Sequence, residues 1–366
     1  MEIICNREIL QKYIIGAERV TSKNSSLPIL SSILLTTSNN TLIIRSTNLE
    51  VGVEFQIPSE IKKGGSIAIP GTLLSNILSS IQEEESIKIN VLNNVCKITT
   101  NTKNITIKGL NTEDYPTIPI IESGEEFTIK STLLIQGIKS VLMSAAVSDI
   151  KPEISSVYMY QKGNELVFVT TDSFRLAEKK VPFTGGDISQ GFIIPIKNIT
   201  EIIKILEPLN ENILIKTTKT QIAFVTKSVY ITSRIIQGIY PDYEQILPKT
   251  QTTEVVLLKQ DLINTLKLST IFSDKFNKTQ FIIDPLNKKF TIASKNTDVG
   301  ETEVSLDVAV SGEPIEIALN SRHLFDCLNT INNDSVILSL SGPQKPVCIK
   351  AVGDQSFVYL TMPLTR

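Results

Sequence analysis

The chain contains little of what metal sites and disulfide frameworks require. Only one histidine and four cysteines occur in 366 residues. The cysteines show no CxxC spacing and fall mostly in apolar patterns, so we expect buried free thiols rather than a disulfide or a zinc site; they are Cys5, Cys96, Cys327 and Cys348. We therefore expect neither a metal nor a cofactor.

Motifs of catalytic and nucleotide-binding sites are also missing. The sequence has no GxxxxGK[ST] loop, no GxSxG elbow and no HExxH pair. His323 follows Arg322 at a predicted helix start, and we interpret it as a surface or capping residue rather than a catalyst. The acidic run Glu83–Glu85 indicates a solvated turn rather than a metal or acid–base cluster, because no histidine converges on it. We therefore expect no enzymatic activity.

Long apolar segments are absent as well. No run of eighteen or more apolar residues occurs, and MEIICNREIL at the start has neither a basic leader nor a signal-type apolar core. We expect a cytoplasmic protein. The hydrophobic content of 41% is ample for compact cores, and the length fits two or three domains.

What the sequence does contain is one pattern repeated three times. Residues 42–58, 166–183 and 290–308 each give an apolar strand, a small polar turn and a second alternating strand. Asn48, Asp172 and Asn296 occupy matching places in the turns, at intervals of 124 residues. A regular interval of this length indicates whole duplicated domains. For the turn at Thr170–Ser173 in particular, we predict an Asx-type turn between strands.

Further landmarks repeat at nearly the same interval. Strands at 67–70, 192–195 and 316–319 each run into an amphipathic helix. Asp114–Pro116 and Ile239–Pro241 match in the first two copies, and short proline-marked linkers follow them. We therefore predict three domains, at residues 1–121, 122–249 and 250–366.

Each domain is predicted to be a doubled unit of strand, helix and three strands. The first copy has helices at 7–20 and 73–81, and strands fill 31–57 and 86–110. Other predicted helices include 131–147, 196–206 and 259–272. The fold class is thus α+β, with antiparallel sheets on one side and two helices per domain on the other.

If three copies form half a circle, the chain closes into a ring only by pairing head to tail with a second copy. Twelve helices spaced about 9 to 10 Å apart would then enclose an opening of about 26 Å. Duplex DNA, about 20 Å wide, would fit that opening.

The chain contains several motifs whose order and spacings resemble those of a known family. They are Ser26–Leu30, Thr47–Glu50, Thr171–Leu176, Tyr240–Tyr243 with Leu247–Pro248, and Val358–Leu364. Across essentially its whole length the chain resembles the sliding clamps, the β subunits of bacterial DNA polymerase III. The resemblance implies three DNA-clamp domains forming half of a six-domain ring. It also implies a homodimer that encircles duplex DNA without catalysis and confers processivity. Such a ring is loaded by a clamp loader and tethers the polymerase III alpha subunit, other polymerases and repair proteins through short peptide motifs.

The resemblance further implies a groove between the second and third domains for a partner peptide rich in glutamine and leucine. The matching positions here are Ile154, Thr171, Ser173, Phe174, Arg175, Leu176, Pro241, Ile246, Val347, Leu360, Met362, Pro363 and Leu364. Without the resemblance, Ile154, Leu176, Ile246 and Leu360 would be interpreted as ordinary core residues.

Charge distribution matters more than the net charge of −2 for a nucleic-acid partner. The predicted helices 7–20, 131–147, 196–206 and 259–272 carry eight basic and four acidic residues, a net +4 that suits weak, sliding contacts. The candidate DNA-facing residues are Arg7, Lys12, Lys139, Lys151, Lys197, Lys204 and Lys267. The alternative for each lysine is a solvated helix face.

For the contact between subunits, the family points to Ile105 on an edge strand and to Ile271 with Phe272 at a helix end. The alternative for these residues is a small satellite core. Two other function classes stay open from the sequence: a peptide-binding adaptor that does not encircle DNA, and a sugar- or nucleotide-modifying enzyme without a recognisable motif.

Overall fold

The computed structural model describes residues 1–22, 27–81, 85–148, 150–248 and 250–364. The chain divides into two compact units. Unit 1 comprises Met1–Ile135, Gly185–Ile188 and Lys197–Gln237, and unit 2 comprises Gln136–Thr184, Ser189–Ile196 and Gly238–Arg366. Both units contain residues of the predicted middle domain, so the boundaries at 121 and 249 stay a prediction.

Unit 1 contains two antiparallel sheets. The smaller sheet has five strands, in the order β5 (Glu60–Lys63), β1 (Glu2–Asn6), β7 (Ser86–Leu92), β8 (Val95–Thr99) and β9 (Asn104–Lys108). The larger sheet has eight, in the order β10 (Glu125–Lys130), β15 (Asn212–Thr217), β16 (Gln221–Val225), β17 (Val229–Arg234), β4 (Val51–Pro58), β3 (Thr41–Thr47), β2 (Ser32–Ser38) and β6 (Ser66–Pro70).

Unit 2 also contains two antiparallel sheets. Its nine-stranded sheet runs β14 (Phe192–Pro195), β11 (Ser156–Lys162), β12 (Glu165–Thr171), β13 (Arg175–Pro182), β26 (Phe357–Thr361), β25 (Val347–Ala351), β24 (Ser335–Leu340), β18 (Thr253–Leu258) and β22 (Ala309–Gly312). Its four-stranded sheet runs β21 (Gly300–Asp307), β20 (Lys289–Asn296), β19 (Lys278–Asp284) and β23 (Ile315–Asn320).

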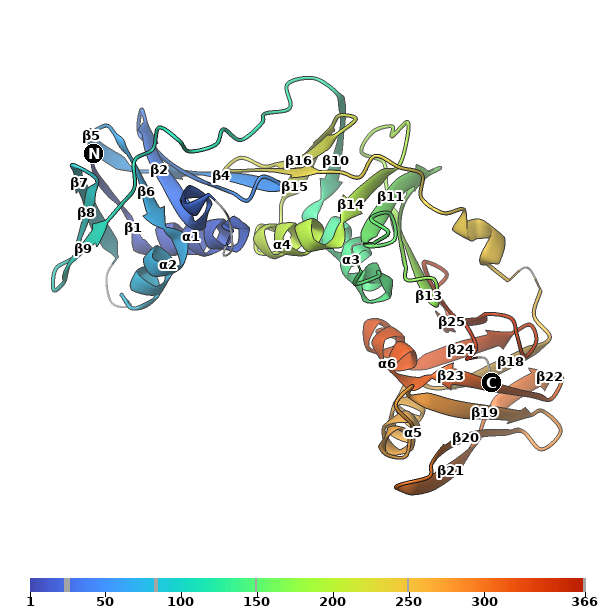
Figure 1. Cartoon of the computed structure of the whole chain (residues 1–366). Helices are drawn as coiled ribbons and strands as arrows, with labels where there is room; N and C mark the ends of the chain where they lie inside the picture. Colours follow the sequence, from blue (N-terminus) through green and yellow to red (C-terminus); the bar gives the residue numbers. More distant parts are fainter. Residues whose placement is uncertain (23–26, 82–84, 149, 249, 365–366) are drawn as a thin grey trace. The chain divides into compact units, whose positions relative to one another are not determined.

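Six α-helices and three 3₁₀ turns complete the described residues. The helices are α1 (Arg7–Val20), α2 (Gly71–Ser79), α3 (Ser131–Val141), α4 (Ile196–Leu206), α5 (Lys259–Ile271) and α6 (Ser321–Thr330). The 3₁₀ turns are η1 (Pro28–Ser31), η2 (Leu142–Ser144) and η3 (Tyr243–Ile246). In unit 1, α1 packs beside α2, as the blue part of Figure 1 shows, and it also packs against β3 and β4. The predicted α+β class with antiparallel sheets is confirmed.

The repeat is visible in the packing of helices on sheets. The hydroxyl of Ser46 on β3 donates to the carbonyl of Ala17 in α1, and that of Thr170 on β12 donates to Val141 in α3. Ser46 and Thr170 are 124 residues apart, and so are Ala17 and Val141. In the third copy, Ser294 on β20 bonds the hydroxyl of Ser269 in α5. One buried hydroxyl therefore ties a helix to the middle strand in each copy.

The helix predicted at 131–147 is wrong at its end, where one of these contacts is made. The amide of Ala145 would bond the carbonyl of Val141 in a continuing helix, but that carbonyl accepts the Thr170 hydroxyl. Ala145 bonds Leu142 instead and adopts an extended conformation, so the helix gives way to η2. Thr21 bonds Glu18 in the same way where α1 ends.

Two short strands were not predicted. β5 pairs with β1, and β22 pairs with β18, so each adds an edge strand to the first strand of its copy. Their four-residue sequences carry too little alternation to be recognised. The three turns at Asn48, Asp172 and Asn296 are as predicted, because each side-chain oxygen accepts a backbone N–H two residues further along.

The four cysteines are buried free thiols, as predicted. Burial raises the pKa of Cys5 and Cys96 to about 12 and that of Cys348 to about 11. In the acidic run, Glu83 and Glu84 lie outside the described residues, and the carbonyl of Glu85 accepts the amide of Arg7.

Candidate functional site

The turn between β12 and β13 presents the first group of predicted groove residues. The Asp172 carboxylate accepts the amides of Phe174 and Arg175, each at 2.9 Å. The hydroxyl of Thr171 accepts the Ser173 amide and donates to the Arg175 carbonyl. Ser173 has a φ of 76°, which lies in the left-handed region and reverses the chain sharply. The turn thereby leaves the Phe174 side chain 65% exposed.

Strand pairing brings the second group alongside the first. In the pairing of β13 with β26, Leu176 lies opposite Leu360 and Arg175 opposite Thr361. On the far side of β26, Val347 of β25 also lies opposite Thr361. The chain after β26 stays on the same surface, because the Met362 amide donates to the Phe174 carbonyl at 2.8 Å. Residues that are distant in sequence therefore form one patch.

The burial of this patch is uneven. Leu176, Leu360 and Val347 are almost fully buried, as the core-packing alternative expected for the two leucines. Phe174, Ile246 and Met362 are exposed, while Pro363 and Leu364 are half-buried and the Leu364 amide donates to Ala318. The patch thus has a buried apolar floor and an exposed apolar rim.

The segment carrying Pro241 and Ile246 is fixed to the same sheet. The ring of Tyr240 stacks on Tyr158 of β11, with centroids 4.7 Å apart. The hydroxyl of Tyr243 in η3 donates to Glu178 of β13, and it also bonds Tyr160. These contacts hold Ile246, which is 48% exposed, near the strand that carries Leu176. Ile154 is half-buried just before β11, and its carbonyl accepts the Ala146 amide.

Arg175 is the charged residue of the patch, and its charge is already paired. Its guanidinium donates to Asp172 at 2.9 Å and to Asp326 of α6 at 2.5 Å. Burial lowers the pKa of Arg175, but the hydrogen bonds to Asp326 and Asp172 outweigh it and the net shift is upward. Sequence reasoning missed Asp326, because nothing local relates it to a residue 151 positions away.

The structure corrects the interpretation of His323. The N-cap of α6 is Asn320, whose side chain accepts the amides of Arg322 and His323. His323 is half-buried, and its carbonyl accepts the hydroxyl of Tyr359 at 2.7 Å. Burial, and then the nearby charge of Arg175, lower the pKa of the imidazole. His323 therefore packs beside the Arg175 cluster as a neutral side chain near pH 7.

Six of the seven predicted DNA-facing residues are exposed: Lys12, Lys139, Lys151, Lys197, Lys204 and Lys267. Arg7 does not fit that role. Its side chain is buried at the start of α1, where its guanidinium donates to the Ile81 carbonyl and to the Gln11 amide oxygen. Because its guanidinium binds these two groups within the fold, Arg7 has a structural role, which corrects the prediction that it faces DNA.

The predicted subunit-contact residues lie at edges. Ile105 is half-buried on β9, which forms one edge of the five-stranded sheet of unit 1. Ile271 is 64% exposed at the end of α5, and Phe272 follows it as the C-cap. The ring of Phe272 lies beside Gly300, the first residue of the edge strand β21.

Within the described ranges, no group of three or more histidine, cysteine, aspartate or glutamate side chains is arranged to hold a metal ion. None of the described helices is long and apolar enough to cross a membrane.

Comparison with known proteins places the whole chain in one family. Models of the DNA polymerase III beta subunit match three successive parts: the N-terminal domain at residues 1–119, the central domain at 128–242 and the C-terminal domain at 244–365. The beta sliding clamps of Buchnera aphidicola and Bacillus subtilis are 28% and 24% identical, with all of this chain and 100% and 99% of those proteins covered. The structure of the Pseudomonas aeruginosa beta subunit aligns over both full chains with a TM-score of 0.95 at 24% identity.

The repeated domains and these matches define the class: the chain is a DNA sliding clamp built from three DNA-clamp domains. It belongs to the DNA polymerase III beta subunit family.

The single histidine generates a pH prediction. Because the pKa of folded His323 lies below the value of about 6.5 expected when unfolded, the unfolded state binds more protons below that pH. Stability should therefore fall as the pH drops below about 6.5. We expect the loss of melting temperature between pH 7.5 and 5.5 to be smaller in His323→Gln than in the parent chain, measured by circular dichroism. Parallel pH profiles for the two proteins would contradict this.

Proposed function

We propose that two copies of this chain close head to tail into a ring around duplex DNA. The ring would tether the DNA polymerase III alpha subunit and other replication and repair proteins, would be loaded by a clamp loader, and would catalyse no reaction itself. The observation that carries this proposal is the threefold repeat of the domain over the full length of the family match. We place the boundaries at 1–121, 122–249 and 250–366, and the protein in the cytoplasm with the DNA.

Exposed lysines support the contact with DNA. Lys12, Lys139, Lys197 and Lys267 lie on four helices and Lys151 on a loop, and all five are exposed. Lys204 is also exposed but is paired with Glu201 at 2.7 Å. Because phosphate contacts are electrostatic and independent of sequence, a few dispersed lysines centre a duplex without holding it at one place.

The patch around Leu176 and Leu360 supports a docking site for partner peptides. The exposed rim of Phe174, Ile246 and Met362 offers apolar area. Apolar anchors with few polar contacts suit weak and exchangeable peptide binding. We therefore assign the partner-peptide groove to these residues.

Edge strands and charge support the proposed subunit contact. β9 carries exposed Lys108 and follows exposed Lys103, whereas β21 carries exposed Glu301 and Glu303. Both strands lie at the edge of their sheet and leave backbone groups for another strand. Opposite charges favour pairing of β9 in one copy with β21 in another, whereas two β9 edges or two β21 edges would repel each other.

Topological linkage to DNA tests the ring. A clamp loaded on a nicked circular plasmid should remain bound through gel filtration, and cutting the plasmid once should release it. An adaptor that does not encircle DNA would elute identically from circular and linear plasmid. Equal retention on both forms would therefore overturn the proposal.

Removal of the C-terminal segment tests the groove. Deleting Met362–Arg366 takes away part of the exposed rim, although Thr365 and Arg366 lie outside the described residues. We expect at least about a tenfold loss of affinity for a fluorescent glutamine- and leucine-rich peptide in anisotropy, with the dimer intact. The matched control is Leu286→Ala, which removes an apolar side chain 91% exposed on the hairpin between β19 and β20. Unchanged affinity in the deletion variant would contradict the assignment.

The subunit contact is tested by combining Ile271→Ala and Phe272→Ala. These changes remove the apolar area beside the edge strand β21, so we expect monomers in analytical ultracentrifugation at micromolar concentration. Higher salt should dissociate the unmodified dimer if opposite charges at β9 and β21 contribute. A full dimer in the double variant would show that the contact lies elsewhere.

A further inference from the structure

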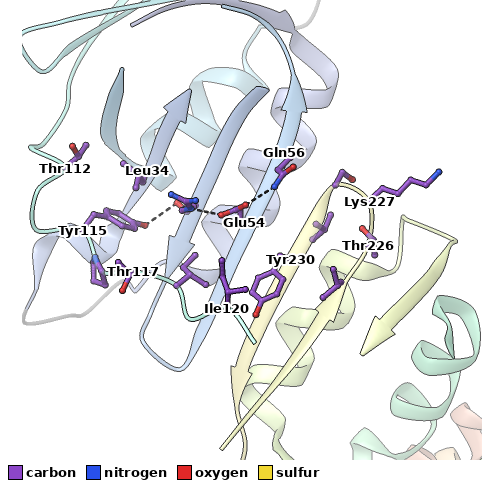
Figure 2. Close-up of a pocket in the computed structure, with 16 residues that line it drawn as sticks. Leu34, Glu54, Gln56, Thr112, Tyr115, Thr117, Ile120, Thr226, Lys227 and Tyr230 are labelled. Atoms are coloured by element: carbon purple, nitrogen blue, oxygen red, sulfur yellow. Dashed lines mark hydrogen bonds and ion pairs between the residues drawn. The ribbon is translucent and has the colours of Figure 1, made fainter. Parts of the chain in front are cut away.

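A pocket lies in unit 1, on the part of the eight-stranded sheet where β4 pairs with β17. It has a volume of about 490 Å³ and is covered by the chain segment that follows β9. Figure 2 shows Glu54 between Tyr115 and Tyr230, with Gln56 further along the same strand. The apolar part of its lining includes Leu34, Tyr115, Ile118, Ile120, Val229 and Tyr230.

Three charged residues lie among these apolar walls: Glu54, its partner Arg45, and Lys227. The Glu54 carboxylate accepts from Arg45 at 2.7 Å and from the Gln56 amide at 3.0 Å. The side chain of Glu54 is only 15% exposed. The hydroxyl of Thr226, which also lines the pocket, is buried and has no hydrogen-bond partner among the described residues. The pocket therefore offers a carboxylate acceptor to a ligand.

The covering segment is fixed, so the pocket is already formed. The hydroxyl of Tyr230 donates to the Pro119 carbonyl at 3.1 Å and accepts the Ile121 amide at 2.8 Å. The hydroxyl of Tyr115 donates to the Ser32 carbonyl at 2.9 Å. Ile118 packs against Gly52 of β4, where there is no room for a larger residue.

The repeat shows what fills the corresponding place in the next copy. Glu54 corresponds to Glu178, 124 residues later, and Ile118 corresponds to Tyr243, 125 residues later. In unit 2, the hydroxyl of Tyr243 donates to Glu178. Leu34 likewise corresponds to Tyr158, which stacks on Tyr240. The first copy thus keeps the carboxylate but has aliphatic side chains where the second has tyrosines.

We propose that the unit 1 pocket receives a tyrosine side chain from a peptide of a partner protein. The phenol donates a hydrogen bond to Glu54, as Tyr243 donates to Glu178 within this chain. The aromatic ring lies against the apolar walls. This site is separate from the groove at Leu176 and does not depend on the proposed ring.

The test is a titration of the full chain with N-acetyltyrosinamide, followed by methyl NMR. We expect saturable shifts at the methyl groups of Leu34, Ile118 and Val229. N-acetylphenylalaninamide, which has the ring but no hydroxyl, should bind about tenfold more weakly, because a hydrogen bond to a charged acceptor is lost. Equal affinity of the two compounds, or no shift at these methyls, would overturn the proposal.

The matched control is a variant whose own side chain fills the pocket. Ile118→Tyr places in the first copy the residue that the second copy has, and it should abolish the shifts at Leu34 and Val229. Ile118→Leu keeps the size and should bind as the parent does. If Ile118→Tyr does not fold, Leu34→Tyr fills the same pocket from β2. Binding that persists in a folded, filled variant would show that the compound occupies another site.

Discussion

The structure depends on the pairing of strands that are far apart in sequence, β4 with β17 in unit 1 and β13 with β26 in unit 2. Each pairing closes an edge that would otherwise leave unpaired backbone groups exposed. Because side chains alternate between faces, the register also decides which residues meet. It places Leu176 opposite Leu360, and it places Tyr230 opposite Glu54. The groove and the pocket are both consequences of these two registers.

The two strand pairings differ in the side chains that pack around them. At β13, Glu178 is buried under Tyr243, whose hydroxyl supplies the hydrogen bond that a buried carboxylate requires. At β4, Glu54 relies on Arg45 and Gln56 and remains partly exposed to a cavity. Duplication therefore preserved the carboxylate and the strand pairing, while the aromatic filling differs between the copies. An unfilled cavity beside a charged group can persist where the strand register is fixed by the rest of the sheet.

The sequence predicted what depends on local pattern and on repetition. The 124-residue interval and the apolar periodicity located the helices and most strands, and the Asx turn at Asp172 followed from its residue types. Features decided by distant partners were missed. The helix ends at Val141, whose carbonyl accepts the hydroxyl of distant Thr170, and Arg7 is buried with its guanidinium donating to the Ile81 carbonyl. Asp326 reaches Arg175 only because the fold brings α6 to the β12–β13 turn.

At the proposed partner-peptide groove, burial decides where a peptide would gain free energy. Leu176 and Leu360 are 1% and 2% exposed before any partner binds, so covering them removes little further area from water. The gain must come from Phe174, Ile246 and Met362, which are 65%, 48% and 37% exposed. The two leucines instead support that rim, because they hold β13 and β26 together beneath it. A rigid floor with an exposed rim limits the ordering cost of binding while leaving only a modest area to cover, which favours rapid exchange of partners over tight binding.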